Sequence, residues 1–190
     1  MPSDRQLTVK AQLTRASLIV AAAVILRESG PGSVTYRRVA EKASAASSSV
    51  GYYFDSIEAL LGEAADYNMR LWSTRAERAA EYAESLILAD CRENVVDLLL
   101  SACLPEEFTN PAAHYEQLLK ASESPVVTEA YKRGRVRLDS AVERILQRSG
   151  FDIDPRLLIA VVDGAAVAGI SEGLNVRENA RSLIKGVLAL

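Results

Sequence analysis

Helix-forming signals run along nearly the whole chain and constrain its fold more than any other feature. No segment shows the sustained alternation of apolar and polar residues that is typical of a half-buried β-strand. All six prolines fall where a helix could begin or end, because proline cannot donate to the helical hydrogen-bond ladder. The sequence therefore predicts an all-α protein of nine or ten helices.

The expected helices have recognisable start and stop residues. Thr35, Ser56 and Asp90 are suitable N-caps, and Asp154 precedes a proline at a first helical position. Gly30 is suited to ending the first helix, because glycine accepts the left-handed backbone of a helix stop. The predicted ranges are about 12–29, 35–43, 47–53, 56 into the eighties, 90–104, a helix beginning at 111, 124–149, 156–173 and 177–188.

The first helix contains the longest apolar stretch of the chain. This stretch, Ala16 to Leu26, is shorter than the roughly 20 residues that a membrane span requires. The amino-terminal residues lack the apolar core and cleavage site of a secretion signal. The two cysteines lack metal-ligand spacing and fit a reduced compartment. We therefore expect a cytoplasmic protein with a buried first helix and no membrane partner.

The composition also argues against most enzyme classes. The chain has one histidine, His114, which is too few for a histidine and cysteine zinc site. No nucleophile–base pair, phosphate-binding loop or metal cluster is recognisable. The sequence therefore predicts no catalytic residues, no metal and no cofactor.

The net charge of −3 is unevenly distributed. Residues 1–61 have a net charge of +2, whereas residues 62–190 have a net charge of −5. This difference indicates a mildly basic amino-terminal module joined to an acidic body. Many DNA-binding domains are far more basic, so the charge alone does not decide for nucleic acid.

The segment from Val34 to Leu61 is the part that indicates a function. It contains two short helices a few residues apart, preceded by a long apolar helix, as in a three-helix helix-turn-helix domain. The second short helix begins with serines, and hydroxyls bind phosphates and base edges. Short helices and serine-rich turns also occur in many other all-α proteins. The candidate DNA-binding residues are Thr35, Tyr36, Arg37, Arg38, Ser47, Ser48, Ser49, Gly51, Tyr52 and Tyr53.

Residues 14–62 resemble the TetR family of bacterial transcriptional regulators. The residues that carry the resemblance are Gly30, Val34-Thr35, Val39-Ala40, Val50 to Phe54, and Ser56-x-Glu58-Ala59-Leu60-Leu61. The resemblance implies a DNA-binding domain over 1–61 and a helical ligand-binding and dimerisation domain over 62–190. It also implies a homodimeric repressor of double-stranded operator DNA that is released by a small-molecule effector.

Three positions depart from the family's pattern. Ser44 stands where the turn usually has glycine, and a non-glycine residue at positive φ costs roughly 1 kcal/mol. Ala46 replaces a capping serine, so Ser47 is the next candidate for the cap. Ile57 replaces a lysine that contacts phosphate in the family, and losing one such contact lowers the salt dependence of binding by about one unit.

The resemblance also locates the dimer surface and the effector pocket. The dimer is expected to form through residues 124–173, where the small residues Gly164, Ala165, Ala168 and Gly169 allow close packing; the alternative is that these four pack within one monomer. The pocket is expected among the middle helices and suits a mostly apolar effector, although each candidate also fits an ordinary core position. His114 is expected to be exposed or structural. The candidate pocket residues are Met69, Trp72, Leu99, Cys103, Tyr115, Leu118, Tyr131 and Val167.

Two functions remain in competition at this point. The first is a ligand-responsive, homodimeric repressor. The alternative is an all-α binding or scaffold protein that keeps the TetR-like fold but has weak or no DNA binding. The small positive charge, Ile57 and the serine-rich recognition helix favour this alternative.

Overall fold

The structure, a computed structural model, describes residues 8–104 and 111–190, and every regular element in these two ranges is a helix. The expected stop at Pro105 lies outside the described residues. The chain divides into two compact units, here called the first unit and the second unit. The first unit comprises Met1–Asn68 and Gln117–Tyr131, and the second comprises Met69–Glu116 and Lys132–Leu190. The predicted all-α fold is confirmed.

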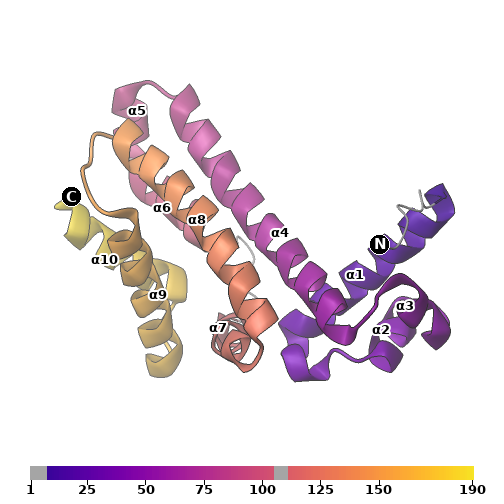
Figure 1. Cartoon of the computed structure of the whole chain (residues 1–190). Coiled ribbons are helices and arrows are strands. Elements are labelled where there is room, and N and C mark those ends of the chain that lie inside the picture. The colour runs from indigo at the N-terminus through magenta and orange to yellow at the C-terminus, as the bar shows by residue number, and fades with distance from the viewer. Residues whose placement is uncertain (1–7, 105–110) are drawn as a thin grey trace. The chain divides into compact units, whose positions relative to one another are not determined.

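The first unit is built around α1 (Figure 1). A short 3₁₀ turn, η1, separates this helix from the two short helices that follow. The unit also contains the first part of α4, the last part of α7, a second 3₁₀ turn and the start of α8. Its elements are α1 (Val9–Ser29), η1 (Pro31–Ser33), α2 (Tyr36–Lys42), α3 (Ser47–Tyr53), α4 (Ile57–Ser85), α7 (Pro111–Lys120), η2 (Ala121–Glu123) and α8 (Pro125–Arg148).

The second unit contains the remaining parts of α4, α7 and α8. It adds α5 (Leu88–Glu93), α6 (Val95–Cys103), α9 (Pro155–Glu172) and α10 (Val176–Leu188). The last two of these helices pack side by side (Figure 1). The predicted domain boundary after residue 61 marks the end of the DNA-binding sequence motif, whereas the division by packing falls at Asn68 inside α4.

Most of the predicted helix ends are confirmed by their caps. The Thr35 hydroxyl accepts a hydrogen bond from the Arg38 amide, and the Ser56 hydroxyl accepts one from the Ala59 amide. The first helix begins three residues earlier than predicted. The reason is Thr8, whose hydroxyl accepts from the Ala11 amide and caps α1.

The prediction of one helix capped by Asp90 is wrong. Two helices, α5 and α6, occupy this region, and α5 begins before Asp90 without a side-chain cap. They meet at Asn94, where the backbone leaves the helical conformation (φ −96°, ψ 5°). The Asn94 side chain donates to the Asp90 carbonyl at 2.8 Å, beside the bond from the Asn94 amide to the same carbonyl at 3.0 Å, so a local side-chain bond accompanies the change of backbone conformation.

The core of the first unit gathers around one face of α1. Leu18, Ala22 and Leu26 are almost completely buried there, together with Val39 of α2 and Val50 of α3. By length and apolar composition alone α1 could cross a membrane. Its buried side chains, from Leu18 to Leu26, instead pack in the core with the short helices. Val9 and Leu13 are exposed, so the expectation of a buried first helix holds only for the second half of α1.

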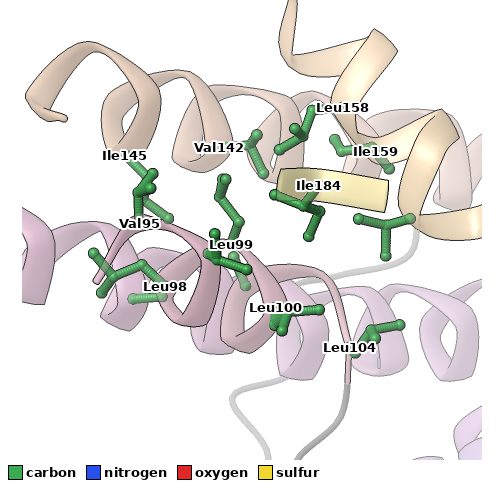
Figure 2. Close-up of a cluster of buried hydrophobic side chains, with 14 of the residues drawn as sticks. Val95, Leu98, Leu99, Leu100, Leu104, Val142, Ile145, Leu158, Ile159 and Ile184 are labelled. Carbon is green, nitrogen blue, oxygen red and sulfur yellow. The ribbon is translucent and has the colours of Figure 1, made fainter. Parts of the chain in front are cut away.

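The core of the second unit joins α6 to the last three helices. Figure 2 shows Leu99 of α6, Val142 of α8, Leu158 of α9 and Ile184 of α10 directed into one apolar cluster. All four side chains are fully buried. Burying each side chain of this size contributes roughly 1.5–3 kcal/mol, so this cluster fixes the packing of the second unit.

Candidate DNA interface and ligand site

The helix α3 presents a polar surface that is anchored by one apolar side chain. Val50 is fully buried, and it holds α3 against the core of the first unit. Ser47, Ser48 and Gly51 are exposed, and Tyr52 is 67% exposed. Because α3 is only 7 residues long and α2 packs closely against it, the pair has the geometry of a brace and a recognition helix.

The predicted DNA-binding residues do not all lie on this surface. Tyr53 is half-buried and packs against the core, with its ring 5.0 Å from that of Tyr52. Tyr36 is also half-buried, and its hydroxyl donates to the Phe54 carbonyl at 3.4 Å. Ser49 is half-buried. Tyr36 thus has a structural role in joining α2 to the end of α3, and we leave it out of the proposed DNA contacts.

Several basic side chains near this surface are engaged within the protein. Arg15 pairs with Glu63, and its guanidinium lies 5.0 Å from the centre of the Phe54 ring. Lys42 pairs with Glu28 at 3.0 Å.

The two candidate arginines of α2 differ in their surroundings. Arg38 donates to the Ser33 carbonyl and the Ser29 hydroxyl, so it braces the turn between α1 and α2. Arg37 is exposed and has no hydrogen bond or ion pair from its side chain to any described residue. Of the two, Arg37 is therefore the better placed to meet a phosphate.

The three departures from the family pattern have clear structural outcomes. Ser44 keeps a positive φ of 52°, so the turn retains the left-handed conformation rather than adjusting to serine. Ala46 is the N-cap of α3, and neither it nor Ser47 supplies a side-chain cap. Ile57 is half-buried and packs against the core of the first unit, where a lysine would lose this apolar contact.

We predict that Ser44→Gly raises the free energy of unfolding by about 0.5–1 kcal/mol. Glycine reaches positive φ without the steric cost that serine pays, although it gains more freedom in the unfolded chain. Urea unfolding would measure the difference. Ala43→Gly is the matched control, because Ala43 has ordinary helical dihedrals and glycine there should destabilise. A destabilised Ser44→Gly variant would contradict the prediction.

A row of aromatic side chains joins α4 to the start of α7 in the second unit. The rings of Trp72 and His114 are 5.0 Å apart, and those of His114 and Tyr115 are 5.2 Å apart. All three side chains are half-buried. Burial, and then the nearby Arg75 guanidinium, lower the pKa of His114 to about 4, so the imidazole is neutral at pH 7.

Polar groups continue this row into α9. The Tyr115 hydroxyl donates to Asp163 Oδ1 at 3.2 Å. Burial raises the pKa of Asp163, although the Tyr115 hydrogen bond and the Arg135 charge oppose the shift. Burial and the Asp163 charge raise the pKa of the Cys103 thiol to about 12, so this cysteine is an unreactive thiol at pH 7.

The predicted pocket residues fall into separate places. Trp72, Cys103 and Tyr115 belong to the polar region just described. Met69 packs against Gly134, and Leu99 is fully buried in the core of the second unit. The other three do not join this region: Tyr131 and Leu118 belong to the first unit, and Val167 is 53% exposed on α9.

Sequence reasoning missed Asp163 as a site residue and gave His114 no role at a site. A signal for Asp163 was present, because it is the only charged residue from Leu157 to Ser171 of α9. A charge in an otherwise apolar helix is costly to bury and therefore indicates a partner or a function. No comparable pattern marks His114, because its contact with the Trp72 ring joins residues distant in sequence.

The exposed apolar residues of the second unit include Leu157 and Val167 on α9 and Leu183 and Val187 on α10. A shallow groove of about 420 Å³ runs between these helices, lined by Val161, Gly164, Ala165, Leu183, Gly186 and Val187. The helix α8 instead exposes charged residues, among them Arg133 and Arg137, and Val136 is its one large exposed apolar residue. The expected dimer surface over 124–173 thus has an apolar face only in its α9 part, and this face continues onto α10 beyond residue 173.

These features define a helix-turn-helix DNA-binding protein with a second helical unit. Two family models match the sequence: the tetR family of bacterial regulatory proteins over residues 18–64, and the tetracyclin repressor-like C-terminal domain over residues 90–190. The chain therefore belongs to the TetR family, whose members are transcriptional regulators rather than enzymes. No curated protein matches the sequence.

Solved structures show the same fold. A TetR transcription regulator from Haloarcula marismortui is 17% identical, with a TM-score of 0.67 over 92% of this chain and 96% of that one. A protein described as a transcriptional regulator from Saccharomonospora viridis, solved with choline, is 17% identical, with a TM-score of 0.67 over 90% and 94%. SmeT of Stenotrophomonas maltophilia, solved with triclosan, is 14% identical, with a TM-score of 0.58 over 93% and 91%.

Proposed function

We propose that this protein is a homodimeric, ligand-controlled transcriptional repressor that acts in the cytoplasm. The observation that carries the proposal is the exposed polar surface of α3, formed by Ser47, Ser48, Gly51 and Tyr52 above the buried Val50. The hydroxyl groups, and the backbone at Gly51 that no side chain covers, are suited to contact base edges and phosphates in a major groove.

We further propose that Thr35, Arg37 and Tyr53 assist this surface. Thr35 and Arg37 are exposed at the start of α2, which in this class of domain crosses the phosphate backbone. The Tyr53 ring is held by the core, so its hydroxyl is positioned at low entropic cost. Because residues 1–61 have a net charge of only +2, affinity should depend on shape and hydrogen bonds more than on charge.

We propose that the dimer forms through α9 and α10. Leu157, Ala160, Gly164 and Val167 are exposed at helical spacing along one face of α9. Val187 of α10 continues this face across the groove. A second copy of the chain is the occupant that we assign to it, because TetR regulators form dimers and two recognition helices must read half-sites about 34 Å apart.

The effector is proposed to bind among Trp72, Cys103, Tyr115 and Asp163 in the second unit. This region combines aromatic surface with a few polar groups, which is the usual composition of a small-molecule site. The two neighbours solved with choline and triclosan bind small molecules, which supports an effector of this size. Ligand binding would release DNA only through its different affinities for the DNA-bound and free conformations.

The alternative, a TetR-like protein with weak or lost DNA binding, is favoured by one observation. The ion pairs Arg15–Glu63 and Lys42–Glu28 remove two cations from contact with phosphates. A mobility-shift assay with the DNA upstream of the protein's own gene decides between the two functions. A salt-sensitive shift on this DNA and not on random duplex supports the repressor, whereas equal, weak binding to both supports the alternative.

We predict that Tyr52→Phe weakens operator binding about 100-fold or more. Each subunit of the dimer would lose one hydrogen bond to a charged phosphate, and such bonds contribute roughly 1.5–3 kcal/mol. Tyr82→Phe is the matched control, because Tyr82 is 60% exposed but lies on α4 in the second unit. Titration by mobility shift measures both variants. Unchanged affinity for Tyr52→Phe would refute the phosphate contact.

A further inference from the structure

The carboxylate of Asp163 has an unusual position for an acidic side chain. It is half-buried on α9, and the described residues offer it one hydrogen bond, from the Tyr115 hydroxyl to Oδ1. No described residue donates to its second oxygen or forms an ion pair with it. A partly buried carboxylate with so little compensation is costly, and its charge remains available to a ligand.

The nearby cations are engaged elsewhere. Arg135 donates to Asp139 at 2.7 Å, so its charge is balanced on its own helix. Arg75 donates to the Ala102 and Cys103 carbonyls at 3.4 Å, where the carboxyl end of α6 carries a partial negative charge. Neither arginine is shown donating to the Asp163 carboxylate, which therefore has no direct cationic partner among the described residues.

The described side chain that contacts the Asp163 carboxylate is aromatic and neutral, whereas Arg75 and Arg135 act in this region only through their more distant charges. Tyr115 links the carboxylate to the row formed with His114 and Trp72, and the imidazole is neutral at pH 7. The faces of aromatic rings attract cations, particularly where water is partly excluded. All four side chains are half-buried rather than fully buried, so each keeps part of its surface exposed to solvent.

We propose that Asp163, Tyr115 and Trp72 bind a small organic cation, an ammonium group with an apolar body. The carboxylate balances the positive charge, and the aromatic faces contact the apolar groups around the nitrogen. The identification of this ligand as the effector rests on the proposed function. The binding itself is independent of DNA and is tested separately.

The test compares choline with its uncharged isostere, 3,3-dimethylbutan-1-ol, in which carbon replaces nitrogen. Trp72 is the only tryptophan of the chain, so its fluorescence reports directly on this region. We expect choline to change the fluorescence in a saturable manner and the isostere to bind at least about 10-fold more weakly. Asp163→Asn should weaken choline binding at least about 10-fold and leave binding of the isostere unchanged.

Asp152→Asn is the matched control, because Asp152 is exposed in the loop before α9 and faces no described partner. This variant should bind choline as the unmodified protein does. Circular dichroism confirms that both variants keep their helical content. Equal binding of choline and the isostere, no saturable response to choline, or unchanged binding by Asp163→Asn would each overturn the cation site.

The mobility-shift assay separates this inference from the proposed function. If the protein binds operator DNA but gives no choline response, the cation site is refuted and the repressor proposal stands. If choline binds but no operator is bound, the repressor proposal fails and the cation site stands. Release of bound operator by choline, and not by the isostere, would support both.

Discussion

Val187→Glu should convert the protein from a dimer to a monomer and lower operator affinity at least about 100-fold. Val187 is 37% exposed and lines the groove between α9 and α10. In a two-fold dimer each substitution would bury an unpaired carboxylate in an apolar contact, which costs several kcal/mol per ion. A monomer presents one recognition helix and cannot engage two half-sites at once.

Light scattering at micromolar concentration measures the conversion from dimer to monomer, since the dimer mass is about 41 kDa, twice the 20.6 kDa of the monomer. Val136→Glu is the matched control, because Val136 is 67% exposed on α8, away from the proposed face. This variant should remain a dimer. If Val136→Glu dissociates the dimer and Val187→Glu does not, the dimer interface lies on α8 and not on α9 and α10.

Gly134→Ala should lower the free energy of unfolding by about 2–3 kcal/mol. In the second unit, a Cβ at position 134 would lie 2.6 Å from Met69 Sδ and 2.8 Å from Met69 Cβ. The second contact is close to the backbone of α4, so rotation of the methionine side chain does not relieve it. The helices must then move apart in a well-packed region, and overpacking of this kind costs about 1–3 kcal/mol.

The same substitution in a Met69→Gly background isolates the cause, because glycine removes the Cβ of residue 69 together with the rest of the side chain. Without any side chain at position 69, Gly134→Ala should cost less than about 0.5 kcal/mol or should stabilise the helix, because alanine is the better helix former. Urea unfolding at one fixed protein concentration measures all four proteins of the cycle, since stability of a dimer depends on concentration. An equal cost of Gly134→Ala in both backgrounds would show that the Met69 contact is not its origin.

The helices and their caps were largely predictable, because the signals are local. Thr35 and Ser56 cap helices as predicted, since a side chain bonds to an amide only three residues away. The break at Asn94 was missed because an asparagine side chain fits both a helix interior and a turn. Only the packing around α5 and α6 selects between these conformations.

The polar region around Asp163 was predicted in part. Trp72, Cys103 and Tyr115 were named from the resemblance, whereas Leu118, Tyr131 and Val167 do not lie with them. Residues that contact each other there come from four helices, and their spacing in sequence carries no information on which faces meet. Hydrophobic periodicity identifies a buried face but not its partner.

The sequence by itself determined the all-α fold, the helix-turn-helix segment and membership of the TetR family. These follow from local patterns: helical periodicity, caps at fixed offsets, and a motif whose residues lie within about fifty positions. Only the tertiary structure decided that Arg15 and Lys42 are used in ion pairs, that the exposed apolar face joins α9 to α10, and that Asp163 meets Tyr115. The physical reason is that charge balance and surface exposure depend on contacts between residues distant in sequence, such as the 48 positions that separate Tyr115 from Asp163.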